Sequence, residues 1–438
     1  MASVTEIAQA MKSVLTETAT QAARETGFVQ RASKLTGAGF VQTVVLGWLD
    51  DPAATLSQLT QVAAALGIAI SPQGLDQRFT PEAAALLAAV LDAALTQIIA
   101  ADPVAIPLLA RFAGVIVQDS SVINLPPDLA AVWRGCGGSN GQSPAALKTQ
   151  VRFDVLTGTL SVLEVDHGRT HDRRSAAQER PVPVGALRLS DLGYFSLRSL
   201  STCAAQEAFF LTRMLSNTAV FDPTGTRLDL CQVLAAAAGA PVDRPVLIGA
   251  TDRVSVRLLA MPVPPDVADQ WRRRLKTEGR RRGQSVSHAS LTLAAWTILV
   301  TNTTPAQLTL AEALVLSRVR WQIELLFKLW KQHGKVDEWR SAKPWRILPE
   351  IYAKLTAMVV QHWLFLLTCW GQPNRSLVQA SATVRSGALL LASGMAGVID
   401  LIVALEQIRR CLHTGCRMNP RRKHPNTYQL LLDLPHAA

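Results

Sequence analysis

The feature that most constrains the fold is a change of pattern near residue 113, where a helical region gives way to short strand-like runs. Residues 113–119, Ala-Gly-Val-Ile-Val-Gln-Asp, form an apolar β-like run that ends in a carboxylate. A short apolar run of this length is consistent with a buried strand. A central strand that ends in an acid directs that acid towards a functional site rather than into the core. We therefore expect Asp119 to belong to a site.

Four further strand-like runs follow the first. Residues 149–156 and 159–166 are joined by a Thr157-Gly158 turn, which predicts a hairpin beside the first strand. The next run again ends in an aspartate, Asp191, and the last covers residues 208–214. Three antiparallel strands followed by alternating helix and strand describe an α/β protein with a ribonuclease-H-like mixed sheet.

The chain is longer than one hydrophobic core usually serves, so we expect several parts. A helical N-terminal part is expected from its Ala, Leu and Gln content, and a β-rich insertion with a basic helix separates two halves of the sheet core, the second of which includes a strand at 294–302. The C-terminal part is again helical. The expected boundaries are 1–110, 111–219, 220–290, 291–345 and 346–438.

Within the N-terminal part, residues 56–78 are similar to a helix-turn-helix. Gly67 is placed to end one helix, and Ser71-Pro72 is placed to begin the next as N-cap and first-turn proline. An ordinary αα-hairpin in a bundle fits the same residues equally well. If the segment reads DNA, the candidate contacts are Gln73, Gln77 and Arg78.

The charge of the chain favours a polyanionic partner. Its formal net charge is +11 and its pI is about 9.8, although an anionic membrane or no specific partner would also be compatible. The densest basic run lies at residues 271–282. A solvated helix face is the commoner meaning of such a run, but the overall charge favours nucleic acid here. The candidate contacts in it are Arg272, Arg273, Arg274, Arg280, Arg281 and Arg282.

Other features suggest a cytoplasmic protein with no membrane segment. The N-terminus lacks a basic region followed by an apolar core, so no secretory signal is visible. Six scattered cysteines without a CxxC pair fit reduced thiols. Two apolar stretches, 357–370 and 388–405, are interrupted by polar residues or glycines and predict buried helices rather than membrane spans.

A third acid lies in residues 320–331. At about 100° per residue, Arg320, Glu324 and Lys331 fall within about 40° of one another on a helix. Apolar neighbours, including Trp321 and Leu325, predict that this helix is largely buried and that its polar stripe faces a partner or a metal. The simpler interpretation is an i,i+4 ion pair between Arg320 and Glu324.

Arginine, three residues, glutamate, six residues and lysine is the signature of the DDE transposases of the insertion-sequence-4 family, the Tyr-Arg-Glu-Lys group. Ser317 stands where that family has its tyrosine. Three other segments resemble family motifs in the right order. They are residues 117–123 around the first aspartate, Asp191 to Ser196, and the Thr-Asn strand at 299–303. The chain thus resembles this family over most of its length.

The resemblance implies that Asp119, Asp191 and Glu324 are catalytic and bind Mg²⁺, with Mn²⁺ as a possible substitute. Phosphodiester chemistry with two metal ions needs such carboxylates. It further implies that Arg320 and Lys331 contact DNA phosphates. Trp321 is a candidate to stack on an unpaired or flipped base, although core packing is the commoner role of a tryptophan inside such a helix.

The implied activity is cleavage at the inverted repeats of the protein's own mobile element and transfer of the freed 3′ end into target DNA. A cut-and-paste pathway with a hairpin intermediate is expected, as is a homodimer in the complex with double-stranded DNA. Two alternatives stay open. One is a catalytically silent, DNA-binding relative, and the other is a general nuclease of the same fold.

Overall fold

The chain passes five times between two compact units. The structure is a computed structural model that describes residues 2–31, 34–137, 143–281, 283–372, 374–419 and 426–433. Unit 1 comprises Met1–Ile106, Asp119–Thr170 and Trp321–Leu432. Unit 2 comprises Pro107–Gln118, His171–Arg320 and Asp433–Ala438. Strand β1 (Val115–Leu125) therefore begins in unit 2 and ends in unit 1.

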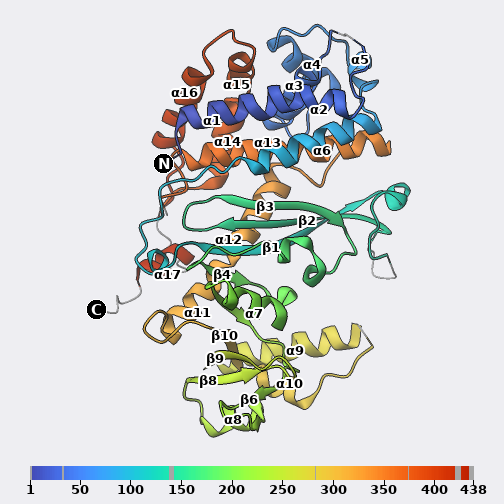
Figure 1. The fold of residues 1–438 in the computed structure, drawn as a ribbon. Coiled ribbons are helices and arrows are strands. Elements are labelled where there is room, and N and C mark those ends of the chain that lie inside the picture. Colours follow the sequence, from blue (N-terminus) through green and yellow to red (C-terminus); the bar gives the residue numbers. More distant parts are fainter. Residues whose placement is uncertain are drawn as a thin grey trace. The chain divides into compact units, whose positions relative to one another are not determined.

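Unit 1 contains a helical bundle built from both ends of the chain (Figure 1). Its N-terminal helices are α1 (Val4–Lys12), η1 (Ser13–Thr18), α2 (Ala19–Glu25), α3 (Gly37–Asp50), α4 (Leu56–Ala65), α5 (Pro72–Asp76) and α6 (Pro81–Thr96). Its C-terminal helices are α12 (Trp321–Lys328), η7 (Leu329–His333), α13 (Pro344–Leu366), α14 (Leu377–Ser386), α15 (Ala388–Met395), α16 (Leu401–Thr414) and α17 (Thr427–Leu432). The expected helical character of both terminal regions is confirmed.

Two long apolar helices, α3 and α13, form the centre of this bundle. Nearly every residue of each is buried, and α13 packs against both α3 and α6. A helix that is apolar all round must be enclosed by others. No helix in the described part of the chain has the length and apolar character needed to cross a membrane. All six cysteines carry free thiols.

The segment expected to be a helix-turn-helix forms two helices, α4 and α5. Gly67 adopts a φ of +75° after α4, and the side chain of Ser71 caps α5 with Pro72 in its first turn. However, α5 has only five residues. Asp76 at its end forms an ion pair with Arg346 of α13, so α5 is also part of the bundle.

The strands of unit 1 follow the order β3-β2-β1, with β2 (Ala145–Asp154) and β3 (Leu160–His167) paired antiparallel as the expected hairpin. Their turn rests against α13. Gly158 has a φ of +74°, and a Cβ there would lie 2.5 Å from Leu366 and 2.7 Å from Trp370, so only glycine fits. Its carbonyl accepts a hydrogen bond of 2.6 Å from Nε2 of His362 in α13.

In unit 2 the strand order is β1-β4-β5-β10-β9-β8-β6-β7. The strands are β4 (Leu187–Ser190), β5 (Phe209–Arg213), β6 (Val220–Phe221), β7 (Arg227–Leu228), β8 (Val242–Ile248), β9 (Val254–Pro262) and β10 (Trp296–Thr301). Strand β4 is parallel to both β1 and β5, whereas β10 is antiparallel to β5 and to β9. A hairpin next to β1, followed by parallel β4 and β5, is the ribonuclease-H-like arrangement that the sequence predicted.

The helices of unit 2 lie between and beside these strands (Figure 1). They are η2 (Leu109–Arg111), η4 (Asp172–Arg174), η5 (Ala176–Gln178), η6 (Leu192–Tyr194), α7 (Leu197–Ala205), α8 (Leu230–Ala236), α9 (Pro265–Arg281), α10 (His288–Leu293) and α11 (Leu310–Val319). In unit 1, η3 (Pro127–Ala131) follows β1. The expected β-rich insertion is present, and its strands extend the sheet beyond β10 rather than forming a separate one.

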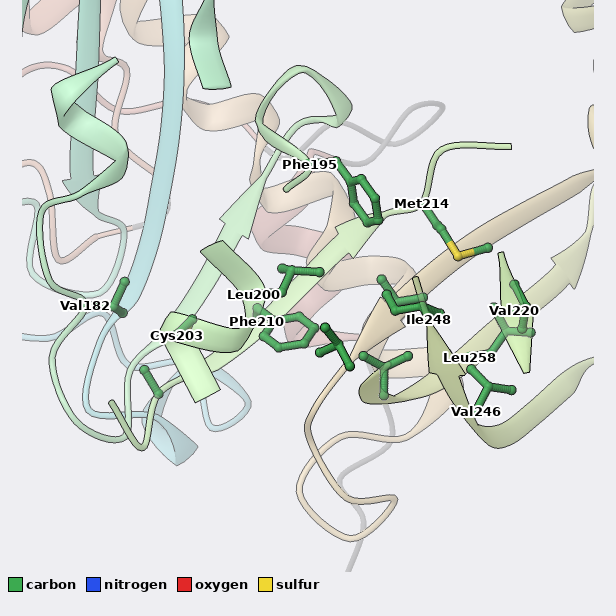
Figure 2. Packing of buried hydrophobic residues seen from close by; sticks show 14 of the residues in the cluster. Val182, Phe195, Leu200, Cys203, Phe210, Met214, Val220, Val246, Ile248 and Leu258 are labelled. Carbon is green, nitrogen blue, oxygen red and sulfur yellow. The ribbon is translucent and has the colours of Figure 1, made fainter. Parts of the chain in front are cut away.

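The main apolar cluster of unit 2 joins α7, β5 and the insertion strands. Figure 2 shows Phe195, Phe210 and Met214 together with Ile248 and Leu258 of the insertion. These residues come from segments on both sides of residue 220, where the insertion begins. The insertion therefore shares its core with α7 and β5, the two elements that follow Asp191 along the chain.

One expectation about the first strand is wrong. The strand does not end at Asp119 but continues to Leu125, and its burial falls from Asp119 onward. The reason is that its parallel partner β4 stops at Ser190, opposite Gln118, while β2 continues beside the rest of β1. Asp119 thus lies in mid-strand, where β1 loses a neighbour and changes from a central to a less buried strand.

Candidate active site

The register between β1 and β4 aligns the two expected aspartates along the backbone. The last paired residues are Gln118 and Ser190, and each is followed directly by an aspartate, Asp119 and Asp191. Parallel strands in register bring equivalent positions next to each other. Both acids therefore follow the point at which β1 and β4 stop pairing, which is where ligands bind to open α/β sheets.

The two aspartates have different surroundings. Asp119 is partly buried, and its Oδ1 accepts a hydrogen bond of 2.8 Å from the backbone N–H of Ser120. Asp191 precedes η6, its side chain is 43% exposed, and its Oδ1 lies 3.8 Å from Nε of Arg320. Its backbone carbonyl accepts the N–H of Tyr194. Neither carboxylate is sealed in the core, so both can be reached by a ligand.

A buried network holds the turn after β4 in place. The guanidinium of Arg188 donates to Gln178 and to Oγ of Ser199, and Gln178 in turn donates to the carbonyl of Tyr194. Burial lowers the pKa of Arg188. The neutral oxygens of Gln178 and Ser199 accept hydrogen bonds from its buried guanidinium. The network joins β4, η5, α7 and η6, and thereby fixes the backbone on either side of Asp191.

Sequence reasoning missed this network. Its signal was present, because Arg188 is a charged residue within a four-residue apolar strand, two positions before Ser190. A buried arginine requires acceptors. Those acceptors come from residues 178 and 199, whose proximity depends on the tertiary fold.

The third acid, Glu324, lies in the first turn of α12 in unit 1 and is partly buried. The helix that carries it is shorter than expected. Helix α11 ends at Val319, Arg320 is its C-cap, and a π-helical turn follows α12 at Leu329–His333. A π turn has i→i+5 hydrogen bonds and rotates less per residue. The even spacing used to place Arg320, Glu324 and Lys331 on one face is therefore wrong for Lys331.

The expectation that this helix is largely buried is also only partly correct. Ile323, Leu326 and Trp330 are buried, but Trp321 and Leu325 are 46% and 44% exposed. Lys328 lies over the Trp321 ring at 5.2 Å. These i, i+4 and i+7 positions form an exposed stripe, and Glu324 flanks it. Trp321 is therefore accessible to a ligand.

Lys331 has an internal contact within unit 1. Its Nζ donates a hydrogen bond of 2.8 Å to the carbonyl of Val122, three residues after Asp119 on β1. This bond places the helix of Glu324 next to the half of β1 that carries Asp119. Ser317, at the family's tyrosine position, donates to the carbonyl of Leu314 in its own helix.

The expected basic contacts in α9 differ in exposure. The side chains of Arg273, Arg274, Arg280 and Arg281 are exposed. Arg272 is instead bound within unit 2, to the carbonyl of Leu291 and to Asp269. Arg282 lies outside the described residues.

In the N-terminal bundle, Gln73 and Gln77 are exposed. Arg78 has a structural contact, because it donates to the carbonyl of Phe28 and stacks on the Phe28 ring at 4.4 Å. Its guanidinium packs into the bundle, unlike the amides of the two glutamines.

The donor set fits a hard divalent cation. Mg²⁺ is usually held by one or two carboxylates together with water and substrate oxygens, so it does not need an all-protein cage. Among the described residues, no group of three or more His, Cys, Asp or Glu side chains is placed to hold a metal ion. Asp191 and Glu324 have partly exposed carboxylates. Such carboxylates can bind a cation that also binds oxygens of the substrate.

A ribonuclease-H-like sheet with acids beside its central strands defines a class of enzymes that transfer phosphoryl groups of polynucleotides. The family model described as "Transposase DDE domain" matches residues 110–360, more than half of the chain. The chain belongs to this family, and it is a DDE transposase, a polynucleotidyl transferase. Enzymes of this kind generally use divalent metal ions.

The relatives are transposases of bacterial insertion sequences. The chain is 24% identical over 364 residues to the transposase for insertion sequence element IS231B of Bacillus thuringiensis subsp. berliner, covering 77% of this chain and 75% of that protein. It is 24% identical over 360 residues to the transposase for insertion sequence element IS1151 of Clostridium perfringens, covering 77% and 76%. A solved piggyBac transposase synaptic complex with hairpin DNA aligns over 98% of this chain and 88% of that chain, with a TM-score of 0.49 and 10% identity.

Proposed function

We propose that the chain is the transposase of an insertion sequence of the insertion-sequence-4 family. It cuts DNA at the terminal inverted repeats of its element in an Mg²⁺-dependent reaction and joins the freed 3′ ends to target DNA. The pathway is cut-and-paste with a hairpin intermediate. The observation that carries the proposal is the β1–β4 register, which ends immediately before both Asp119 and Asp191.

In this proposal Asp119, Asp191 and Glu324 hold Mg²⁺, for which Mn²⁺ can substitute. When bound, the metal ions supply Lewis-acid activation of the attacking and leaving oxygens. The protein's part is to hold the carboxylates. The Arg188 network fixes the turn that carries Asp191, and the Lys331–Val122 bond fixes the helix of Glu324 beside β1.

Arg320 and Lys331 contact the phosphates beside the cleaved bond. Arg320 lies 3.8 Å from Asp191 and has a planar guanidinium with several donors, so it can bind a phosphate while it neutralises that carboxylate. Lys331 uses one N–H for Val122, which leaves further ammonium donors for a phosphate. Both charges would oppose the negative charge that develops at phosphorus.

Double-stranded DNA is the proposed partner, as the transposon ends and as the target. Its further contacts come from the exposed arginines of α9, from the Trp321 stripe and from Gln73 and Gln77. Arg78 supports this surface by packing on Phe28. Two copies of the chain pair two DNA ends, and the reaction takes place on DNA in the bacterial cytoplasm.

A cleavage assay with site variants tests the proposal. A labelled duplex that carries the element's terminal repeat is incubated with the full chain and Mg²⁺. We expect Asp119→Asn, Asp191→Asn and Glu324→Gln each to lower the rate of cleavage by at least about 10³-fold. The reason is that removing one of several catalytic groups that act together costs nearly as much as removing all of them. Asp128→Asn, an exposed aspartate on η3, is the matched control and should cut like wild type.

The same assay separates the alternatives. Wild-type protein that binds the repeat without nicking it would identify a silent DNA-binding relative, for which Ser317 in place of tyrosine is the favouring observation. Equal cutting of duplexes without the repeat would identify a general nuclease. Undiminished cleavage in the three acid variants would refute the proposed site.

A further inference from the structure

Unit 2 contains an open groove that none of the expected site residues lines. It has a volume of about 480 Å³, and all of its lining residues lie between Arg173 and Asp252. The floor is apolar and consists of Phe195, Leu197 and Leu215. These three belong to or pack against the main apolar cluster of unit 2, in which Figure 2 shows Phe195 beside Met214. The floor is thus part of the core and holds its shape.

The rim of the groove is cationic. Arg173 on η4 and Arg198 in the first turn of α7 line it together with Asn217 and Thr218, while Asp252 is its one acid. Both arginines are exposed, and neither guanidinium has a hydrogen-bonding or ion-pair partner among the described residues. Arginines that are not neutralised by the protein favour an anionic ligand, and a guanidinium suits phosphate geometry. Helix α7 also begins here, with the positive end of its dipole.

The wall opposite α7 is rigid. A Cβ on Gly249, which has a φ of +96°, would lie 2.5 Å from Leu197, so the turn between β8 and β9 packs directly on the floor. Arg253 holds this turn by stacking 3.3 Å above the Phe221 ring and by donating to the carbonyl of Ala250. The groove is therefore preformed, which lowers the entropic cost of binding.

The chain links the groove to the candidate active site within unit 2. Asp191 is followed by η6 and then at once by Phe195 on the groove floor. Arg173 lies on η4, which packs against η6, and the Asp172 carboxylate lies 3.4 Å from where a Cβ on Gly193 would be. An open groove that starts at this turn suits a chain that enters and leaves it, whereas small-ligand sites enclose most of their ligand.

We propose that this groove binds the phosphodiester backbone of a DNA strand that runs away from Asp191, with its phosphates held by Arg173 and Arg198. The inference rests on the proposed action on DNA and adds a contact surface that lies outside the signature helix and outside α9. It makes Arg173 and Arg198 binding residues rather than catalytic ones.

Salt-dependent binding of the full chain tests this inference. The variants are Arg173→Gln, Arg198→Gln and the double variant, and the matched control is Arg227→Gln, an exposed arginine on β7 outside the groove. The probes are a fluorescein-labelled 30-base-pair duplex and a single strand of the same length, in EDTA so that no chemistry occurs. Each lost phosphate contact should reduce the slope of log K against log[salt] by about 0.9 on the duplex.

We expect the double variant to have a slope shallower by about 2 and the Arg227→Gln control to match wild type. A double variant that matches the control would overturn the inference. A second result would also overturn it: inorganic phosphate abolishes the groove-dependent part of DNA binding at an ionic strength where chloride does not. The site would then take free phosphate and not a strand. Equal melting temperatures exclude unfolding as the cause.

A photo-crosslinking amino acid gives a readout that does not depend on charge. Placed at Asn217 on the rim it should crosslink to the DNA probe, and placed at Thr224, exposed on the turn between β6 and β7, it should not. Equal crosslinking at the two positions would contradict the proposed strand path. These binding measurements are independent of cleavage, so a wild-type protein that fails to cut DNA would refute the proposed function while leaving the groove testable.

Discussion

His362 shows how a single buried residue couples the bundle of unit 1 to its hairpin. Its Nε2 donates to the carbonyl of Gly158, which fixes the tautomer, and its Nδ1 is buried with no partner among the described residues. Because the ring is fully buried, desolvation lowers the pKa of His362 from 6.5 to about 4, although the hydrogen bond to Gly158 acts in the opposite direction. The histidine is therefore neutral in the folded protein at neutral pH.

This environment predicts a pH-dependent stability. Above pH 6.5 the ring is neutral in both states and the full stability is present. As the pH falls from about 6.5 to about 4, the unfolded chain binds a proton that the folded protein does not, so up to about 3 kcal/mol is lost. In His362→Gln, whose amide can still donate to Gly158, this loss should disappear. Denaturant midpoints measured between pH 7 and pH 4 check it.

The control for this experiment is His413→Gln, at an exposed histidine in α16. It should keep the wild-type dependence on pH. If wild type and His362→Gln lost stability in parallel over this range, the account of the buried ring would be wrong.

The side chains of the candidate site illustrate what a sequence can predict at this scale. The proposal of Asp119, Asp191 and Glu324 as site residues rests on short motifs in a fixed order. The sequence did not indicate the network beside them, because Arg188 reaches Gln178 and Ser199 through the tertiary fold. Nor did the sequence indicate that Trp321 would be exposed, since an apolar residue in an apolar helix usually packs in the core.

Among the elements, the segment from α12 to α13 is held by a buried ion pair. Nζ of Lys354 lies 2.8 Å from Oε1 of Glu350, and both side chains are almost wholly inaccessible. Lys354 also donates to the carbonyls of Lys335 and Glu338, in the loop that follows the π turn. Burial lowers the pKa of Lys354 and raises the pKa of Glu350, so each depends on the other to stay charged. The pair connects α13 to the helix that carries Glu324.

Breaking this pair should destabilise the protein strongly. Lys354→Met leaves Glu350 buried without its partner and two carbonyls without a donor, so we expect a loss of about 3–5 kcal/mol. Replacing both residues, as Lys354→Met with Glu350→Leu, should recover part of the loss because no unpaired charge remains. Unfolding in urea measures both effects. A double variant that is less stable than Lys354→Met alone would contradict the interpretation.

The elements themselves were largely predictable, and their ends were not. The hairpin with its Thr157-Gly158 turn, the insertion strands near β8 and β9, and the basic helix α9 follow from local patterns. Strand β1 was cut short in the prediction because an acid within a strand resembles a strand end. Its continuation depends on β2, which is distant in sequence and keeps pairing after β4 has stopped.

For the whole molecule, the chain passes between its two units at residues 106/107, 118/119, 170/171, 320/321 and 432/433. Two of these crossings adjoin residues of the candidate site, namely Asp119 and Arg320. The division could not be read from the sequence, since the pattern suggested five successive parts along the chain. The family match over residues 110–360 includes segments of both units.

In the proposed function, the three acids act together to move a DNA strand from one site to another. An assay of strand joining tests this. A precut duplex with the element's terminal repeat is incubated with a supercoiled target plasmid, Mg²⁺ and the full chain, and the junctions are sequenced. We expect junctions between the 3′ end of the repeat and the target for wild type, and none for Glu324→Gln. Junctions formed equally well by Glu324→Gln, or by wild type with a duplex that lacks the repeat, would contradict it.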